Sequence, residues 1–156
     1  MVKICAWIGL ALWIGGLTLF IGVVTPVAFK TFGKEEAARF VGVLFPAVDR
    51  WALIWSLVTA GSLARIFLNR HFALRSLALE LPVGLMVVLT LYTSLILHPH
   101  IRELKRKIDL PEFQQTAHQQ TIQFAFHRLH RCSVQIHGVI LTLGLLSLGL
   151  APRFLR

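Results

Sequence analysis

Four long apolar stretches dominate the chain, and the segments between them hold most of its charged residues. The first stretch, Ile4 to Phe29, is 26 residues long and carries no charge. The others are Trp51–Ala64, Ser76–Leu97 with one interruption at Glu80, and Cys132–Pro152. Because crossing about 30 Å of hydrocarbon takes about 20 helical residues, the pattern predicts four membrane-spanning helices. Their expected bounds are about 4–29, 47–68, 75–98 and 129–151.

The connections predict how these helices are arranged. The tight connection Asn69–Leu74 joins the second and third spans, so these two are expected to be antiparallel neighbours. Residues 35–45 place apolar side chains at helical spacing with charges opposite, which predicts a short interfacial helix ended by Pro46. We therefore expect a single transmembrane domain over residues 1–156, folded as an all-α up-down four-helix bundle.

The third connection keeps a helical pattern beyond the membrane. Ile101, Leu104 and Ile108 continue the apolar stripe of the third span, and Asp109 with Glu112 is typical of a helix start. Helices three and four are therefore expected to project from the bilayer as a hairpin over residues 100–127 that turns at Asp109.

Composition and charge support a membrane protein. Hydrophobic residues make up 56% of the chain and charged residues 15%, whereas soluble domains have about 45–50% and about 25%. Sixteen Lys and Arg against seven Asp and Glu give a net charge of +9. Because the basic residues flank the spans and form no single stripe, they are interpreted as anchors for lipid headgroups. The expected partner is the lipid bilayer, and no nucleic acid.

Glu80 is a carboxylate about one turn inside the third span. Ionisable residues inside spans are rare and mark functional sites by default. Arg65 lies at a similar depth on the second span, across the tight connection. We interpret Arg65 and Glu80 as an intramembrane ion pair that fixes the register of the two helices, with a functional carboxylate as the alternative.

The histidines form a second polar group. His98 and His100 end the third span, and His127 and His130 begin the fourth, so all four are expected at one membrane interface. Imidazole is the commonest metal ligand in proteins, which makes these four candidates for a metal site. No His-x-x-x-His or Cys-x-x-Cys spacing accompanies them, so polar packing is the preferred interpretation. No resident cofactor is expected, with a metal or a b-type haem as the alternatives.

His137 lies deeper in the fourth span, on the order of 10 Å into the bilayer, where a polar group needs a partner. Ser133 is one turn earlier on the same helix face. The candidate polar site therefore consists of five residues, His98, His100, His130, Ser133 and His137. The chain shows no phosphate-binding glycine loop, nucleophile elbow or acid–base carboxylate pair, so no enzymatic activity is expected.

Several segments in the same order are similar to the transmembrane protein 205-like family. They are Ala11–Leu17, Thr25–Phe29, Leu44–Pro46, Leu97–Arg102 and Phe126–His130 followed by Ser133. The resemblance covers essentially the whole chain and implies a small four-helix membrane protein whose activity is not settled. It also implies that Phe126, His130 and Ser133 are family-typical positions, and that His137 stands where the family more often carries Asn.

These observations favour an integral membrane protein that acts in transport or permeation, or as an accessory membrane subunit. One alternative is a metal- or haem-binding membrane protein that uses the interface of His98, His100 and His130. Another is a structural partner that docks on a second membrane protein through the hairpin 101–126. A homo-oligomer is also compatible with the small residues along the spans.

The distribution of basic residues predicts the topology. The first and third connections carry ten Lys and Arg, and the termini with the second connection carry six. The positive-inside rule then places both termini on the non-cytoplasmic side. A cysteine introduced at Gln115 should therefore resist an impermeant thiol reagent added outside intact cells and react after permeabilisation. Labelling before permeabilisation would invert the topology.

Overall fold

The computed structural model describes residues 1–69, 74–108 and 119–154, and shows a helical protein. The elements are α1 (Val2–Leu19), η1 (Phe20–Val24), α2 (Thr25–Thr31), α3 (Lys34–Asn69), α4 (Leu74–Tyr92), η2 (Thr93–Leu97), α5 (His98–Ile108) and α6 (Gln119–Phe154), where η marks a π-helix. Four continuous helical stretches are long and apolar enough to cross a membrane: Val2–Thr31, Lys34–Ile66, Glu80–Ile108 and Gln120–Leu150. The predicted all-α four-helix bundle is confirmed.

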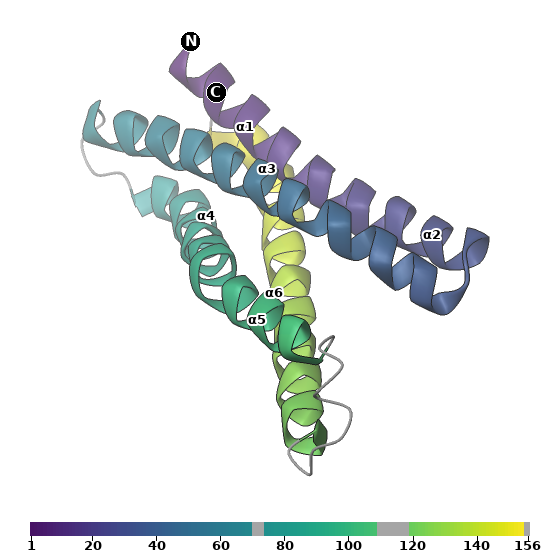
Figure 1. Cartoon of the computed structure of the whole chain (residues 1–156). Helices are drawn as coiled ribbons and strands as arrows, with labels where there is room; N and C mark the ends of the chain where they lie inside the picture. The colour runs from purple at the N-terminus through teal and green to yellow at the C-terminus, as the bar shows by residue number, and fades with distance from the viewer. Residues whose placement is uncertain (70–73, 109–118, 155–156) are drawn as a thin grey trace.

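The helices form two pairs that cross each other (Figure 1). One pair is α1–α2 packed along α3, and the other is α4–α5 packed along α6. The pairs meet in a core of large buried side chains, which includes Trp13 and Ile14 of α1, Met86 of α4 and Ile140 of α6. The core thus fixes α1 against both members of the second pair.

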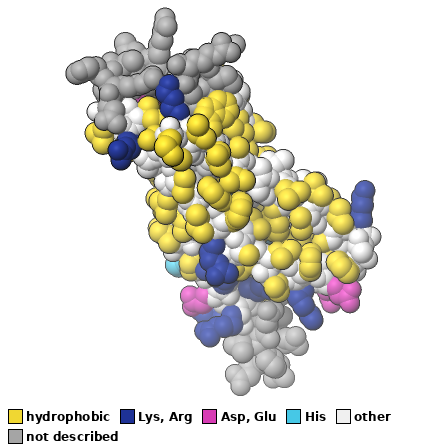
Figure 2. All heavy atoms as spheres, turned by 90° about the horizontal axis from the view of Figure 1, so that it is seen from above, with side chains coloured by type: hydrophobic (Ala, Val, Ile, Leu, Met, Phe, Trp, Pro, Cys, Tyr) yellow, Lys and Arg dark blue, Asp and Glu magenta, His cyan; other side chains and the backbone are white. Residues whose placement is uncertain are grey.

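The outer surface is suited to lipid. Large apolar side chains are exposed on every long helix, such as Ile4, Leu57, Leu85 and Leu146. Figure 2 shows them over the middle of the molecule, with Lys and Arg towards its ends. An exposed apolar surface of this extent is stable only in contact with lipid or another protein. The chain is therefore a multi-pass integral membrane protein.

Helix α3 differs from the expected arrangement. Residues 35–45, predicted as a separate interfacial helix, form its first part, and Pro46 lies inside the helix. This part packs on protein at Ala37, which is fully buried, whereas Phe40 contacts Phe32 at 5.7 Å between ring centroids and stays exposed. The predicted turn at Asp109 lies outside the described residues.

Each π-helix has a local cause in the sequence. In each π-helix, the residue whose N–H bonds to a carbonyl five residues earlier is followed directly by a proline. These pairs are Thr25–Pro26 and His98–Pro99. A proline has no N–H for the carbonyl four residues earlier and its ring clashes with that carbonyl, so a wider turn relieves the clash. The backbone N–H of His98 accordingly bonds to the carbonyl of Thr93, five residues earlier.

Close packing of α6 on α1 generates a test of the core. A Cβ added to Gly144 would collide with Ile14, whereas one added to Gly138 on the same helix would meet nothing within 4 Å. Gly144→Ala should lower the free energy of unfolding by about 1–3 kcal/mol because it overpacks the core. Gly138→Ala should leave it unchanged or raise it by up to about 1 kcal/mol through helix propensity. Thermal unfolding in detergent measures both, and equal melting temperatures would contradict this packing.

Candidate functional site

A group of buried polar side chains lies where three helical segments meet, and we call it the polar cluster. Its members come from α3, η2–α5 and α6, and they are Asp49, Ser94, His98, Ser133 and His137. Only 3% of His98 and 4% of Ser133 is exposed, and the Asp49 side chain is 10% exposed. The cluster therefore places a carboxylate and two imidazoles inside the protein.

Asp49 connects α3 to the other segments. Its Oδ1 accepts a 2.8 Å hydrogen bond from the Ser94 hydroxyl. Its Oδ2 lies 3.0 Å from Nδ1 of His98, and Nε2 of His98 shares a 3.0 Å hydrogen bond with Oγ of Ser133. The carboxylate is thus held from one side by η2 and from the other by the first residue of α5.

His137 completes the cluster from one turn further along α6. Its Nδ1 lies 2.8 Å from the backbone carbonyl oxygen of Ser133, which can only accept a hydrogen bond. Nδ1 therefore carries the proton, and Nε2 of the neutral ring keeps its lone pair. The ring stacks on that of His98, with centroids 5.5 Å apart and planes 19° from parallel.

Phe45 covers the two imidazoles. Its ring meets His98 edge-on at 4.8 Å and His137 at 5.8 Å between centroids, and it contacts Phe20 of η1 at 5.9 Å. Phe45 precedes Asp49 by one turn of α3, on the side of the Lys34 end. Aromatic side chains from α3 and η1 thus separate the cluster from the charged end of the bundle.

The structure brings together three of the five predicted site residues. His98, Ser133 and His137 lie in the polar cluster. His100 is exposed, and its Nδ1 is 3.2 Å from the carbonyl of Ile96. His130 is also exposed and stacks on Phe126 at 5.9 Å.

The other predicted metal candidate, His127, packs edge-on against Phe126. Asp49 and Ser94 are cluster members that the sequence analysis did not single out. The signal that was available for Asp49 is a carboxylate at the edge of an apolar stretch, next to Arg50.

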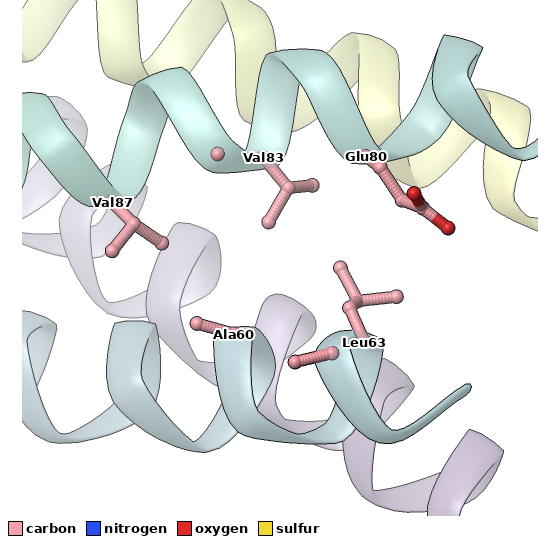
Figure 3. Close-up of a pocket in the computed structure, with 7 residues that line it drawn as sticks. Ala60, Leu63, Glu80, Val83 and Val87 are labelled. Atoms are coloured by element: carbon pink, nitrogen blue, oxygen red, sulfur yellow. The ribbon is translucent and has the colours of Figure 1, made fainter. Parts of the chain in front are cut away.

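The predicted ion pair between Arg65 and Glu80 is not among the ion pairs formed by the described residues. Arg65 is exposed. Glu80 lines a groove of about 290 Å³ between α3 and α4, where Leu63 and Val83 point towards each other (Figure 3). The groove is mostly apolar, so it places one carboxylate beside aliphatic side chains.

Asp49 contacts His98, and His98 contacts Ser133, as the three residues of a serine hydrolase triad do. Ser133, however, is buried inside the regular helix α6, where neighbouring backbone N–H groups bond along the helix and are not free to stabilise an oxyanion. A different property of the cluster fits its surroundings better. One donor atom each from Asp49, His98 and His137 lies within 4.8 Å of the others. The arrangement is suited to holding a cation.

The fold and the cluster define a helical membrane protein with a buried polar centre. Residues 8–109 match the domain of unknown function DUF4149, and the chain belongs to this family. The match covers most of α1 and every described element from η1 to α5, and with them Asp49, Ser94 and His98. No curated protein and no solved structure matches the chain.

Burial of His98 generates a test of the cluster. Carbethoxylation of the protein in detergent, followed by mass spectrometry, should modify His100, His127 and His130 much faster than His98, because those three are exposed. Phe45→Ala should accelerate modification of His98, since it removes the ring that covers it. If His98 of the unchanged protein reacted as fast as His100, the cluster would be open to water, in conflict with the structure.

Proposed function

We propose that this protein moves a small cation across the membrane and that the polar cluster binds the cation on its way. The observation that carries the proposal is the Asp49 carboxylate, which contacts the Ser94 hydroxyl and the His98 imidazole and has His137 nearby, inside an apolar bundle. Ionisable side chains inside membrane helices are rare and are, by default, candidates for ion or substrate pathways.

The energetic cost of Asp49 supports a functional role. Placing an Asp at the centre of a membrane helix costs about 2.5–3.5 kcal/mol, which is an upper bound for Asp49 at the edge of its apolar stretch. The contacts with Ser94 and His98 offset part of this cost. A buried polar group is often no more stabilising than apolar side chains of the same volume, so stability does not explain its presence.

The charge of the cluster favours a cation over an anion. Within the described residues, no Lys or Arg forms an ion pair with Asp49. With neutral imidazoles, the cluster carries one negative charge in a region of low dielectric, where the attraction for a cation is strong. This supports transport or permeation over a purely structural role.

The alternatives from the sequence have less support. His98, His100, His127 and His130 do not form a converging donor group among the described residues. The middle of the hairpin 101–126, proposed as a docking surface, lies outside the described residues at 109–118. We keep as further proposals a closer relation to the transmembrane protein 205-like family, termini on the non-cytoplasmic side, and the absence of enzymatic activity.

Ion flux into proteoliposomes tests the proposal. Vesicles with the purified protein should take up at least one of Na⁺, K⁺ and Zn²⁺ faster than empty vesicles. Asp49→Asn should reduce that uptake to the level of empty vesicles, because it removes the charge and keeps an oxygen for the Ser94 hydroxyl.

The matched control is Glu103→Gln, since Glu103 is an exposed carboxylate that pairs with Lys107 at the surface. This variant should keep the uptake of the unchanged protein. Uptake that is absent from the unchanged protein, or that Asp49→Asn leaves intact, would refute cation transport through the cluster.

A further inference from the structure

We infer that the polar cluster binds a divalent transition-metal ion of the zinc or iron(II) class, with Asp49, His98 and His137 as ligands. This inference specifies which cation the proposed function concerns, and it rests on that proposed function. Donor atoms of the three side chains lie within 4.8 Å of one another. Two imidazoles and one carboxylate form a common ligand set for catalytic zinc and non-haem iron(II).

The contact between Asp49 and His98 has the spacing of two metal ligands. Oδ2 and Nδ1 are 3.0 Å apart, yet Nδ1 has no aligned hydrogen-bond partner among the described residues, although His98 is 3% exposed. Adjacent ligands at about 2.0–2.2 Å from a metal lie about 2.8–3.6 Å apart in octahedral or tetrahedral geometry. Both atoms are therefore placed to face one ion.

Each proposed ligand has one outer partner that orients it. The Ser94 hydroxyl bonds to Oδ1 of Asp49, and Oδ2 is turned towards His98. The Ser133 hydroxyl pairs with Nε2 of His98, and Nδ1 of His98 is turned towards Asp49. The Ser133 carbonyl accepts a hydrogen bond from Nδ1 of His137, so Nε2 of His137 keeps its lone pair. Metal-binding histidines usually donate their second N–H to such a group.

The chemistry of the donors selects the class of ion. Na⁺, K⁺, Mg²⁺ and Ca²⁺ prefer oxygen ligands, whereas imidazole nitrogens favour zinc, iron, copper and nickel. His137 must approach the other two ligands by on the order of 1 Å to complete a site with normal metal–ligand bonds. Its ring stands on a helix and has a free Nε2, so a small side-chain rotation brings that nitrogen closer.

Titration with Co²⁺ tests the inference in the full-length protein, purified in detergent and stripped with a chelator. Co²⁺ should bind near one equivalent per chain and give visible d–d absorption, which Zn²⁺ then abolishes by displacement. Ser94→Ala should weaken Co²⁺ binding by about 10–100-fold, the usual effect of removing a residue that hydrogen-bonds to a metal ligand. Asp49→Asn and His137→Gln remove a ligand itself, so they should weaken Co²⁺ binding by at least that much.

His130→Gln is the matched control, because His130 lies on the same helix seven residues earlier and outside the cluster. It should bind Co²⁺ as the unchanged protein does. Zn²⁺ should also raise the melting temperature of the unchanged protein and of His130→Gln, but not that of His137→Gln. Ser94→Ala keeps all three ligands, so a folded variant with weakened binding is expected even if a ligand substitution unfolds the protein.

Absence of Co²⁺ binding, or binding lost in His130→Gln and kept in His137→Gln, would overturn the metal site. If K⁺ uptake depends on Asp49 and Co²⁺ does not bind, the transport proposal stands and this inference falls. If Co²⁺ binds as expected and no ion flux depends on Asp49, the metal site stands and transport falls.

Discussion

Burial of the Asp49 carboxylate among apolar helices determines how the two helix pairs are joined. Asp49 needs polar partners, and none of them lies on its own helix. Ser94 and His98 supply them from the neighbouring pair of helices, and Ser133 and His137 extend the group across α6. The interaction therefore links the two helix pairs, whose remaining contacts are mainly non-directional packing.

Small side chains make this meeting of helices possible. Gly144 lets Ile14 and Met86 approach α6, and Gly16 lies directly against the indole of Trp51, whose Nε1 donates a 3.1 Å hydrogen bond to the carbonyl of Leu12. In membrane proteins, packing and hydrogen bonds replace the hydrophobic driving force between helices. The apolar core and the polar cluster thus both hold the helices together, the core by close packing and the cluster by hydrogen bonds.

The sequence predicted four membrane-spanning helices because twenty-residue apolar stretches are a strong signal. It singled out His98 as the end of a span, His137 from its depth and Ser133 as the residue one turn before it. Depth does not report the side of a helix on which a residue lies. His98 and His100 are two residues apart and so face nearly opposite directions, which explains why only one of them joins the cluster. Asp49 lies within the expected span 47–68 but was passed over, because its partners Ser94 and His98 lie about 45 residues or more away in the sequence and only the fold brings them to it.

The π-helix before His98 has a consequence for comparing this chain with its relatives. A π turn accommodates one more residue than an α turn, so η2 acts as a one-residue insertion between α4 and α5. Each residue rotates the helix by about 100°, and a relative without the extra residue would turn its equivalent of His98 away from Asp49. Alignments of the family should therefore allow a gap within residues 93–97. In a relative that lacks the extra residue, the structural counterpart of His98 stands one column earlier in an alignment without that gap. In a relative that keeps the π turn, it stands in the same column.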